Sequence, residues 1–184
     1  MAVAAGEYEI GSRHAGRLLL RTFRQGVAAK AGHDLVIEAT EWDGHVHVPA
    51  DPAQQPSVSV RVDLGLLKVL EGTGGVKPLS EGDKQQIQQT MRKVLQVDRD
   101  PHVLFTSTGV DVQDGAAVVA GELTLAGQTH PLSLDVRQRN DNTIAGTATV
   151  VQSQWGIRPY TGFFGALKLR DAVDIEFTAW LQSG

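Results

Sequence analysis

Apolar and polar residues alternate with a period of two along most of the 184-residue chain. In segment 58–64, valines and a leucine alternate with Ser59, Arg61 and Asp63. Successive side chains of a β-strand point to opposite faces, so this pattern indicates strands with one buried and one wetted face. The pattern predicts strands at 17–23, 34–39, 42–48, 58–64, 102–108, 117–125, 129–137, 143–151 and 173–181.

Short glycine-containing or polar segments separate the predicted strands. Asp114-Gly115 is a strong signal for a tight hairpin between two β-rich segments. Gly127-Gln128 predicts a type II′ turn before the strand at 129–137. The segment 139–142 predicts a further polar turn. The chain therefore favours an antiparallel all-β fold, and closure into a barrel would protect its edge strands.

One segment has the period of a helix. Ser80 can cap a helix N-terminus, and Asp83 three residues later completes a capping-box pattern. The residues that follow place one apolar stripe on a helix at Ile87, Met91, Val94 and Leu95. We predict one amphipathic helix over about 80–95 that packs on the sheet as a lid or flank.

Composition narrows the organisation and the partners. The length and the absence of a linker predict a single domain over 1–184, and no cysteine is present for thiol or disulfide chemistry. A net charge of −4 with scattered Lys and Arg gives no general attraction to nucleic acid or to an anionic membrane. No segment has the length of a membrane span, and the first ten residues do not form a signal peptide. We therefore expect a cytoplasmic protein.

Four of the ten aromatic residues lie within one ten-residue stretch that has neither a strand nor a helix period. They are Trp155, Tyr160, Phe163 and Phe164, and Pro159 would break a helix there. Large rings on an irregular loop either fill a core or line a pocket, and these two interpretations stay open. Arg158 beside the rings could meet the polar end of a mostly apolar molecule.

Other patterns with chemical potential are weak. His33 and Asp34 are adjacent on a predicted strand and point to opposite faces. They therefore cannot hydrogen-bond to each other there as the histidine and aspartate of a catalytic base would. His45 and His47 share a wetted face, without a third nearby metal ligand in the sequence. The glycine-rich segment 71–77 has Pro78 where a phosphate-binding loop would enter its helix, so we interpret it as a mobile loop. The sequence therefore predicts no catalytic residue, metal site or cofactor.

Several motifs, taken in order, resemble the YceI-like family over about residues 7–181, nearly the whole chain. They are Gly-His-Asp-Leu at 32–35, Trp-Asp-Gly at 42–44, 95–107, 121–127, Trp-Gly-Ile at 155–157 and Asp-Ala-Val at 171–173. The segments 74–79, 156–160 and 165–168 further resemble the actinobacterial branch of that family.

The resemblance implies an extended eight-stranded antiparallel β-barrel of lipocalin-like shape. It also implies a long apolar channel that holds a polyisoprenoid or a similar lipid chain. Barrels of this family often pair, so a homodimer is a further expectation. The family provides no catalytic residues to transfer onto this chain.

The first hypothesis is a non-enzymatic protein that binds a polyisoprenoid, an isoprenoid quinone or a fatty-acid derivative inside the barrel. The predicted ligand-binding residues are Leu18, Leu20, His33, Val60, Val62, Phe105, Leu123, Leu134, Trp155, Ile157, Arg158, Tyr160, Phe163, Phe164, Ile175 and Phe177. Among them, His33, Arg158 and Tyr160 are candidates for the head-group end. One alternative is a cytoplasmic stress or interaction module with a filled barrel. Another is an enzyme for lipophilic substrates with His33 as general base.

Overall fold

The computed structural model describes residues 3–140 and 142–184, apart from the side chain of Phe163. Twelve strands form one antiparallel sheet, and three short strands form a second. The strands are β1 Gly6–Gly11, β2 Arg17–Thr22, β3 Arg24–Gln25, β4 Asp34–Ala39, β5 Trp42–Val48, β6 Ser57–Asp63, β7 Leu67–Thr73, β8 His102–Gln113, β9 Ala116–Leu125, β10 Gln128–Asn140, β11 Thr143–Val151, β12 Thr161–Gly162, β13 Leu167–Leu169, β14 Ala172–Trp180 and β15 Gln182–Ser183. The α-helix is α1 Glu81–Val94, and short 3₁₀ turns occupy Ser12–His14, Ala29–Ala31, Leu64–Leu66, Gln152–Trp155 and Phe163–Gly165.

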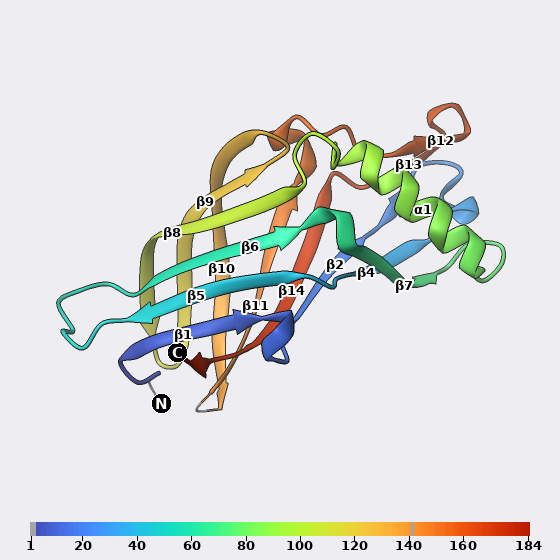
Figure 1. The fold of residues 1–184 in the computed structure, drawn as a ribbon. Coiled ribbons are helices and arrows are strands. Elements are labelled where there is room, and N and C mark those ends of the chain that lie inside the picture. The colour runs from blue at the N-terminus through green and yellow to red at the C-terminus, as the bar shows by residue number, and fades with distance from the viewer. Residues whose placement is uncertain (1–2, 141) are drawn as a thin grey trace.

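The large sheet curls strongly into a half-barrel (Figure 1). Its strand order is β15-β1-β5-β6-β8-β9-β10-β11-β14-β2-β4-β7, so the expectation of eight strands is wrong. The last residues of the chain connect distant parts of the sheet. Strand β14 pairs with β11, whereas β15, which directly follows β14 in the sequence, pairs with β1. Beyond β14 the sheet continues through β2, β4 and β7.

The helix matches the sequence prediction and covers an edge of the sheet. Ser80 caps α1, and its hydroxyl accepts a hydrogen bond from the Asp83 backbone N–H while the Asp83 carboxylate accepts from Ser80. The backbone N–H of Val69, on edge strand β7, donates to the side chain of Gln88 at 3.0 Å. This contact gives a partner to one backbone group of an edge that would otherwise pair with another chain.

The hairpin turns follow local backbone rules, with one correction. Asp114 and Gly115 both have positive φ, as a type I′ hairpin between β8 and β9 requires. The turn between β9 and β10 is Ala126-Gly127, one residue earlier than predicted, and both residues again have positive φ. It is therefore of type I′ rather than II′. The predicted turn at 139–142 includes Asp141, which lies outside the described residues.

Candidate functional site

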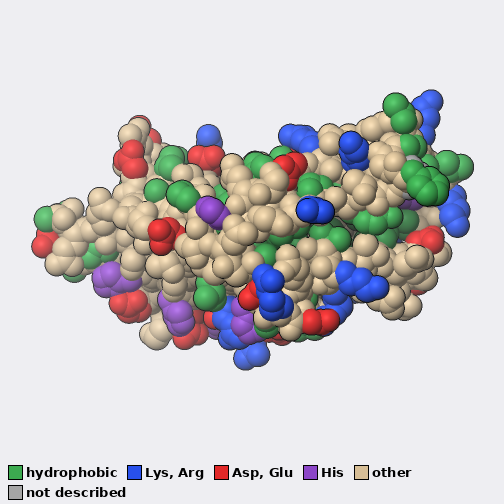
Figure 2. All heavy atoms as spheres, turned by 90° about the horizontal axis from the view of Figure 1, so that it is seen from above, with side chains coloured by type: hydrophobic (Ala, Val, Ile, Leu, Met, Phe, Trp, Pro, Cys, Tyr) green, Lys and Arg blue, Asp and Glu red, His purple; other side chains and the backbone are tan. Residues whose placement is uncertain are grey.

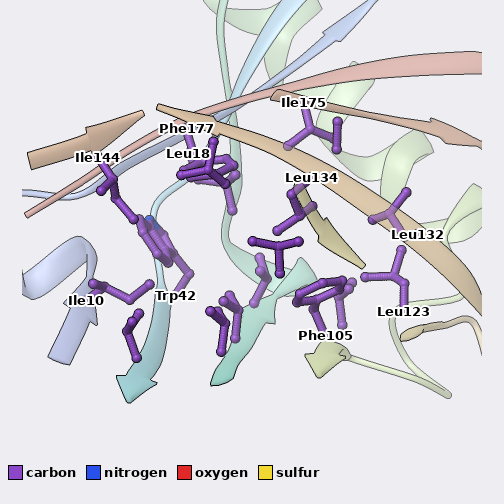
Figure 3. Close-up of a pocket in the computed structure, with 18 of the residues that line it drawn as sticks. Ile10, Leu18, Trp42, Phe105, Leu123, Leu132, Leu134, Ile144, Ile175 and Phe177 are labelled. Carbon is purple, nitrogen blue, oxygen red and sulfur yellow. The ribbon is translucent and has the colours of Figure 1, made fainter. Parts of the chain in front are cut away.

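The concave face of the curled sheet surrounds one apolar cavity of about 660 Å³. Alternate residues of several strands point into it, among them residues of β2, β6, β8, β9, β10, β11 and β14 (Figure 3). On β9, for example, Val119 and Leu123 are buried on the inner face while Val118 and Glu122 are exposed on the outer face. The period-two pattern of the sequence thus becomes the wall of a cavity.

Most of the apolar residues predicted for ligand binding lie on this wall. They are Leu18 and Leu20 of β2, Val60 and Val62 of β6, Phe105 of β8, Leu123 of β9, Leu134 of β10, Ile157, and Ile175 and Phe177 of β14. The structure therefore brings these residues together from six strands and one turn. Their contact with a ligand remains a prediction.

Trp155 is buried but does not line the cavity. Its side chain is 1% exposed, and its indole N–H donates to the backbone carbonyl of Leu123 at 2.9 Å. The ring of His130 packs edge-on against it, with 5.5 Å between centroids. Gly156 follows in a left-handed conformation and turns the chain back, so that Ile157 reaches the wall. Trp155 therefore fills the core behind one end of the cavity.

The rest of the aromatic stretch lies away from the cavity wall. Tyr160, Arg158 and Phe164 are exposed at the surface, and the side chain of Phe163 lies outside the described residues. Neither Arg158 nor Tyr160 is among the residues that line the cavity, and their role at the head-group end stays a prediction. The stretch thus divides into a buried part around Trp155 and an exposed part beyond Pro159.

His33 also lies outside the cavity. Its Nε2 is 2.7 Å from the backbone carbonyl of Lys77, and the carboxylate of Asp34 accepts the backbone N–H of Arg24 at 2.8 Å. Neither histidine nor aspartate therefore faces the other or the cavity. The segment 71–77, which the sequence predicts as a mobile loop, is partly strand, because 71–73 belongs to β7 and pairs with β4. The position of His33 outside the cavity removes the geometric basis for His33 as a general base on a cavity-bound substrate.

The two ends of the cavity differ. At one end, next to Trp155, the lining residues Leu64, Leu125 and Val173 are buried. At the other, the β8–β9 hairpin leaves Val112 58% exposed beside Asp114. The cavity is therefore closed near Trp155 and open near this hairpin. The sequence predicts Asp114-Gly115 only as a turn. The alternation of polar and apolar residues that continues to Val112 is the signal that places this turn at the rim of the cavity.

Charges are almost absent from the cavity wall. Among the described residues, Asp114 is the charged side chain that lines it, and Gln138 and Gln152 are the amides. No described lysine, arginine or histidine lines the cavity. The wall can therefore desolvate an apolar chain, whereas it offers an anionic group no cationic partner.

Ionisable pairs lie on the outer face of the sheet. The guanidinium of Arg21 on β2 donates to Glu176 on β14 at 2.7 Å, and this hydrogen bond raises the pKa of Arg21. His47 lies 2.5 Å from Glu7 on the neighbouring strand, also away from the cavity.

Within 3–140 and 142–184, no three potential metal ligands of the His, Cys, Asp or Glu type cluster together. No helix in the described part of the chain has both the length and the apolarity that a bilayer crossing needs.

The sequence profile of the YceI-like domain matches residues 23–181 of this chain. The structure is similar to Burkholderia cenocepacia BcnA, with a TM-score of 0.65 and 15% identity over 90% of this chain and 95% of that one. It is also similar to a polyisoprenoid binding domain from Saccharophagus degradans implicated in plant cell wall breakdown, with a TM-score of 0.58 and 11% identity over 96% of this chain and 99% of that one. A Campylobacter jejuni YceI protein aligns with a TM-score of 0.55 and 13% identity over 80% of this chain and 85% of that one. No curated protein sequence matches the chain.

Proposed function

Because the chain belongs to the YceI-like domain family, we propose that it is a non-enzymatic protein that binds the hydrocarbon chain of a lipophilic molecule inside its curled sheet. The polyisoprenoid-binding domain of similar fold makes a polyisoprenoid the first candidate. An isoprenoid quinone and a fatty-acid derivative have the same slender apolar shape. The observation that carries the proposal is the large cavity with an almost wholly apolar wall.

The size of the cavity favours an occupant. The space of about 660 Å³ leaves the apolar side chains of the wall without packing partners on their inner side. Water can enter through the open end, but the wall gives it few hydrogen-bond partners. An apolar chain satisfies this wall better than water does.

A simple estimate shows that the wall can supply useful affinity. Each buried CH₂ group contributes about 0.8 kcal/mol. Ten such groups contribute roughly 8 kcal/mol before the entropic costs of binding, and a longer chain that buries more groups offsets those costs. Directed polar contacts are therefore needed only to orient the ligand.

The charges at the cavity favour a ligand with an uncharged head. Among the residues that the structure describes, no cation lines the wall, and the charged residue that does, Asp114 at the open end, is acidic. A phosphate or carboxylate carried into this cavity would lose hydration without gaining a partner. Among the candidates, a polyprenol or an isoprenoid quinone fits better than a polyprenyl phosphate or a free fatty acid.

The two alternatives have less support. A filled barrel would leave no elongated space, whereas the wall encloses about 660 Å³. Catalysis by His33 on a bound lipid would need that side chain at the cavity, and it contacts Lys77 instead. Both observations favour binding over a solid interaction module or an enzyme.

Lipid analysis of the purified protein tests the proposal directly. We expect solvent extraction and mass spectrometry to recover a lipophilic molecule, and the delipidated protein to take up geranylgeraniol with a raised Tm. Geranylgeranyl phosphate of the same chain length should bind more weakly. Absence of both a co-purified lipid and uptake of geranylgeraniol would contradict the proposed function. Equal binding of alcohol and phosphate would contradict only the preference for an uncharged head.

A further inference from the structure

Three segments at the closed end of the molecule have an unusual charge composition. The segments 23–33, 72–79 and 156–170, here named the tip, contain six of the 17 Lys and Arg residues and none of the 21 Asp and Glu residues. The whole chain has a net charge of −4, so this concentration of positive charge is local. Acidic residues flank the three segments in the sequence at Asp34, Glu71 and Asp171, and Asp83 of α1 lies near Lys77 and His33.

Contacts between backbones, and one between a side chain and a backbone, hold the three segments against one another. Strand β13 pairs with β3 and with β12, and the backbone N–H of Ala28 donates to the carbonyl of Ala166 at 3.0 Å. The third segment joins through His33, which contacts the Lys77 carbonyl at 2.7 Å. The tip is therefore one continuous surface although its parts are far apart in the sequence.

The cations of the tip are largely available to a partner. Arg24 pairs with Asp34, and the guanidinium of Arg170 lies over the ring of Phe23. The remaining cations are exposed and form no salt bridge in the part of the chain that the structure describes; they are Lys30, Lys77, Arg158 and Lys168. Lys77 also interacts electrostatically with Asp83. An anionic surface could approach Lys30, Arg158 and Lys168 without displacing a salt-bridge partner.

Apolar side chains project from the same surface. Val27 is 96% exposed, Val76 is 86% exposed, and the ring of Phe164 is fully exposed. Phe164 also has φ 56° and ψ 35°, a left-handed conformation that is uncommon for a bulky residue. Figure 2 shows hydrophobic side chains beside Lys and Arg side chains at this end of the molecule. Strained residues cluster at functional sites, and here the strain accompanies an aromatic ring held in solvent.

We propose that the tip docks on the surface of a bilayer that contains anionic phospholipids. The cations meet the head groups, while Phe164, Val27 and Val76 insert their side chains at the level of the acyl boundary. A protein partner with an acidic groove would explain the cations, but three separate apolar side chains on short loops suit a soft, fluid surface better. The tip lies opposite the open β8–β9 end of the cavity, so docking leaves that end free (Figure 1).

Vesicle co-sedimentation of the full chain tests this proposal. The probes are phosphatidylcholine vesicles with and without about one-third phosphatidylglycerol, neither containing an isoprenoid. We expect binding to the anionic vesicles at least about tenfold tighter than to the neutral ones, weakened by added salt. The double variant Lys30→Gln/Lys168→Gln should lose on the order of tenfold or more, because each cation near such a surface contributes about fivefold. The control Arg137→Gln/Arg139→Gln removes two exposed cations from β10 and should bind as the wild type does.

The variant Phe164→Gly separates docking from folding. Glycine adopts the left-handed conformation freely, so this variant should unfold at the same or a higher temperature while binding anionic vesicles several-fold more weakly. Equal binding to both vesicle types, or equal loss in the control and the Lys30/Lys168 variants, would overturn the proposal. A change in oligomeric state without vesicle binding would also overturn it and assign the tip to a second copy of the chain. Uptake of geranylgeraniol is measured without vesicles, so failure of docking leaves the proposed function standing.

Discussion

The two ends of the cavity are built from the same kind of strand, but one end is closed and the other is open to solvent. At the closed end, Trp155 hydrogen-bonds to Leu123 and the surrounding lining residues are buried. At the open end, the strands β8 and β9 extend to a tight turn, and Val112 stays largely exposed. The difference shows that a few residues outside the strands decide which end of an apolar sheet is sealed. Stability should therefore depend on the closed end, and ligand entry on the open end.

The largest effect is expected from Trp155→Ala at the closed end. Truncation of a buried Trp typically costs about 3–5 kcal/mol of unfolding free energy, because packing is lost and a void remains. Urea unfolding of the variant measures this loss. The control Trp180→Ala, on the outer face of β14 where the ring is 44% exposed, should lose much less. Similar losses in the two variants would mean that Trp155 does not seal the core.

A substitution at the open end should affect binding without a comparable loss of stability. Ala117 of β9 lines the cavity near the rim, so Ala117→Trp should narrow the entry and reduce geranylgeraniol uptake by about tenfold or more. Ala120 of the same strand points outward, which makes Ala120→Trp a matched control. Titration with the alcohol compares the two. Unchanged uptake by Ala117→Trp would place the entry elsewhere.

A smaller effect is expected away from both ends, at the N-terminus of α1. Ser80→Ala removes the hydroxyl that accepts the Asp83 backbone N–H, and loss of such a cap costs about 1 kcal/mol. Chemical unfolding should show this loss with geranylgeraniol affinity unchanged, since Ser80 lies outside the cavity wall. A large drop in affinity would show that the helix contributes to the ligand site.

The smallest effect is a pH dependence of the same cap. Hydrogen bonds from the Ser80 backbone and hydroxyl lower the pKa of Asp83 from its ordinary value of 3.8. The stabilisation is therefore complete above that value and is lost as the pH falls through the lowered pKa of the folded state. The stability difference between wild type and Asp83→Asn should be constant near neutrality and shrink in acid. A difference that grows in acid would have the wrong sign.

Much of the cavity wall could be predicted from the sequence because strand periodicity is local. Alternation alone places Leu123 and Val119 on one face, and no distant contact changes that face. The capping box of α1 is local for the same reason. The strand count was less predictable. In β7, a bulge against Val36/Ile37 interrupts the alternation, and its last residues resemble a glycine-rich loop.

The aromatic stretch shows the limit of sequence reasoning. Trp155 and Phe164 are nine residues apart and both aromatic, yet one is buried and the other is in solvent. The left-handed Gly156 reverses the chain after Trp155, and β13 then pairs with β12 and with β3 outside the large sheet. Such placement depends on tertiary pairing between distant segments, which composition and period do not encode. The sequence therefore did not show that Arg158 and Tyr160 lie away from the cavity wall.

The central claim is that a hydrocarbon chain occupies the interior of the curled sheet. Methyl NMR of the delipidated protein, titrated with geranylgeraniol, tests it most directly. We predict saturable shifts of the inward methyl groups of Leu134 and Ile175, with little change at Leu104, which faces outward on β8. Saturation that leaves the inward methyl groups unmoved, or that moves only outward ones such as Leu104, would contradict the account.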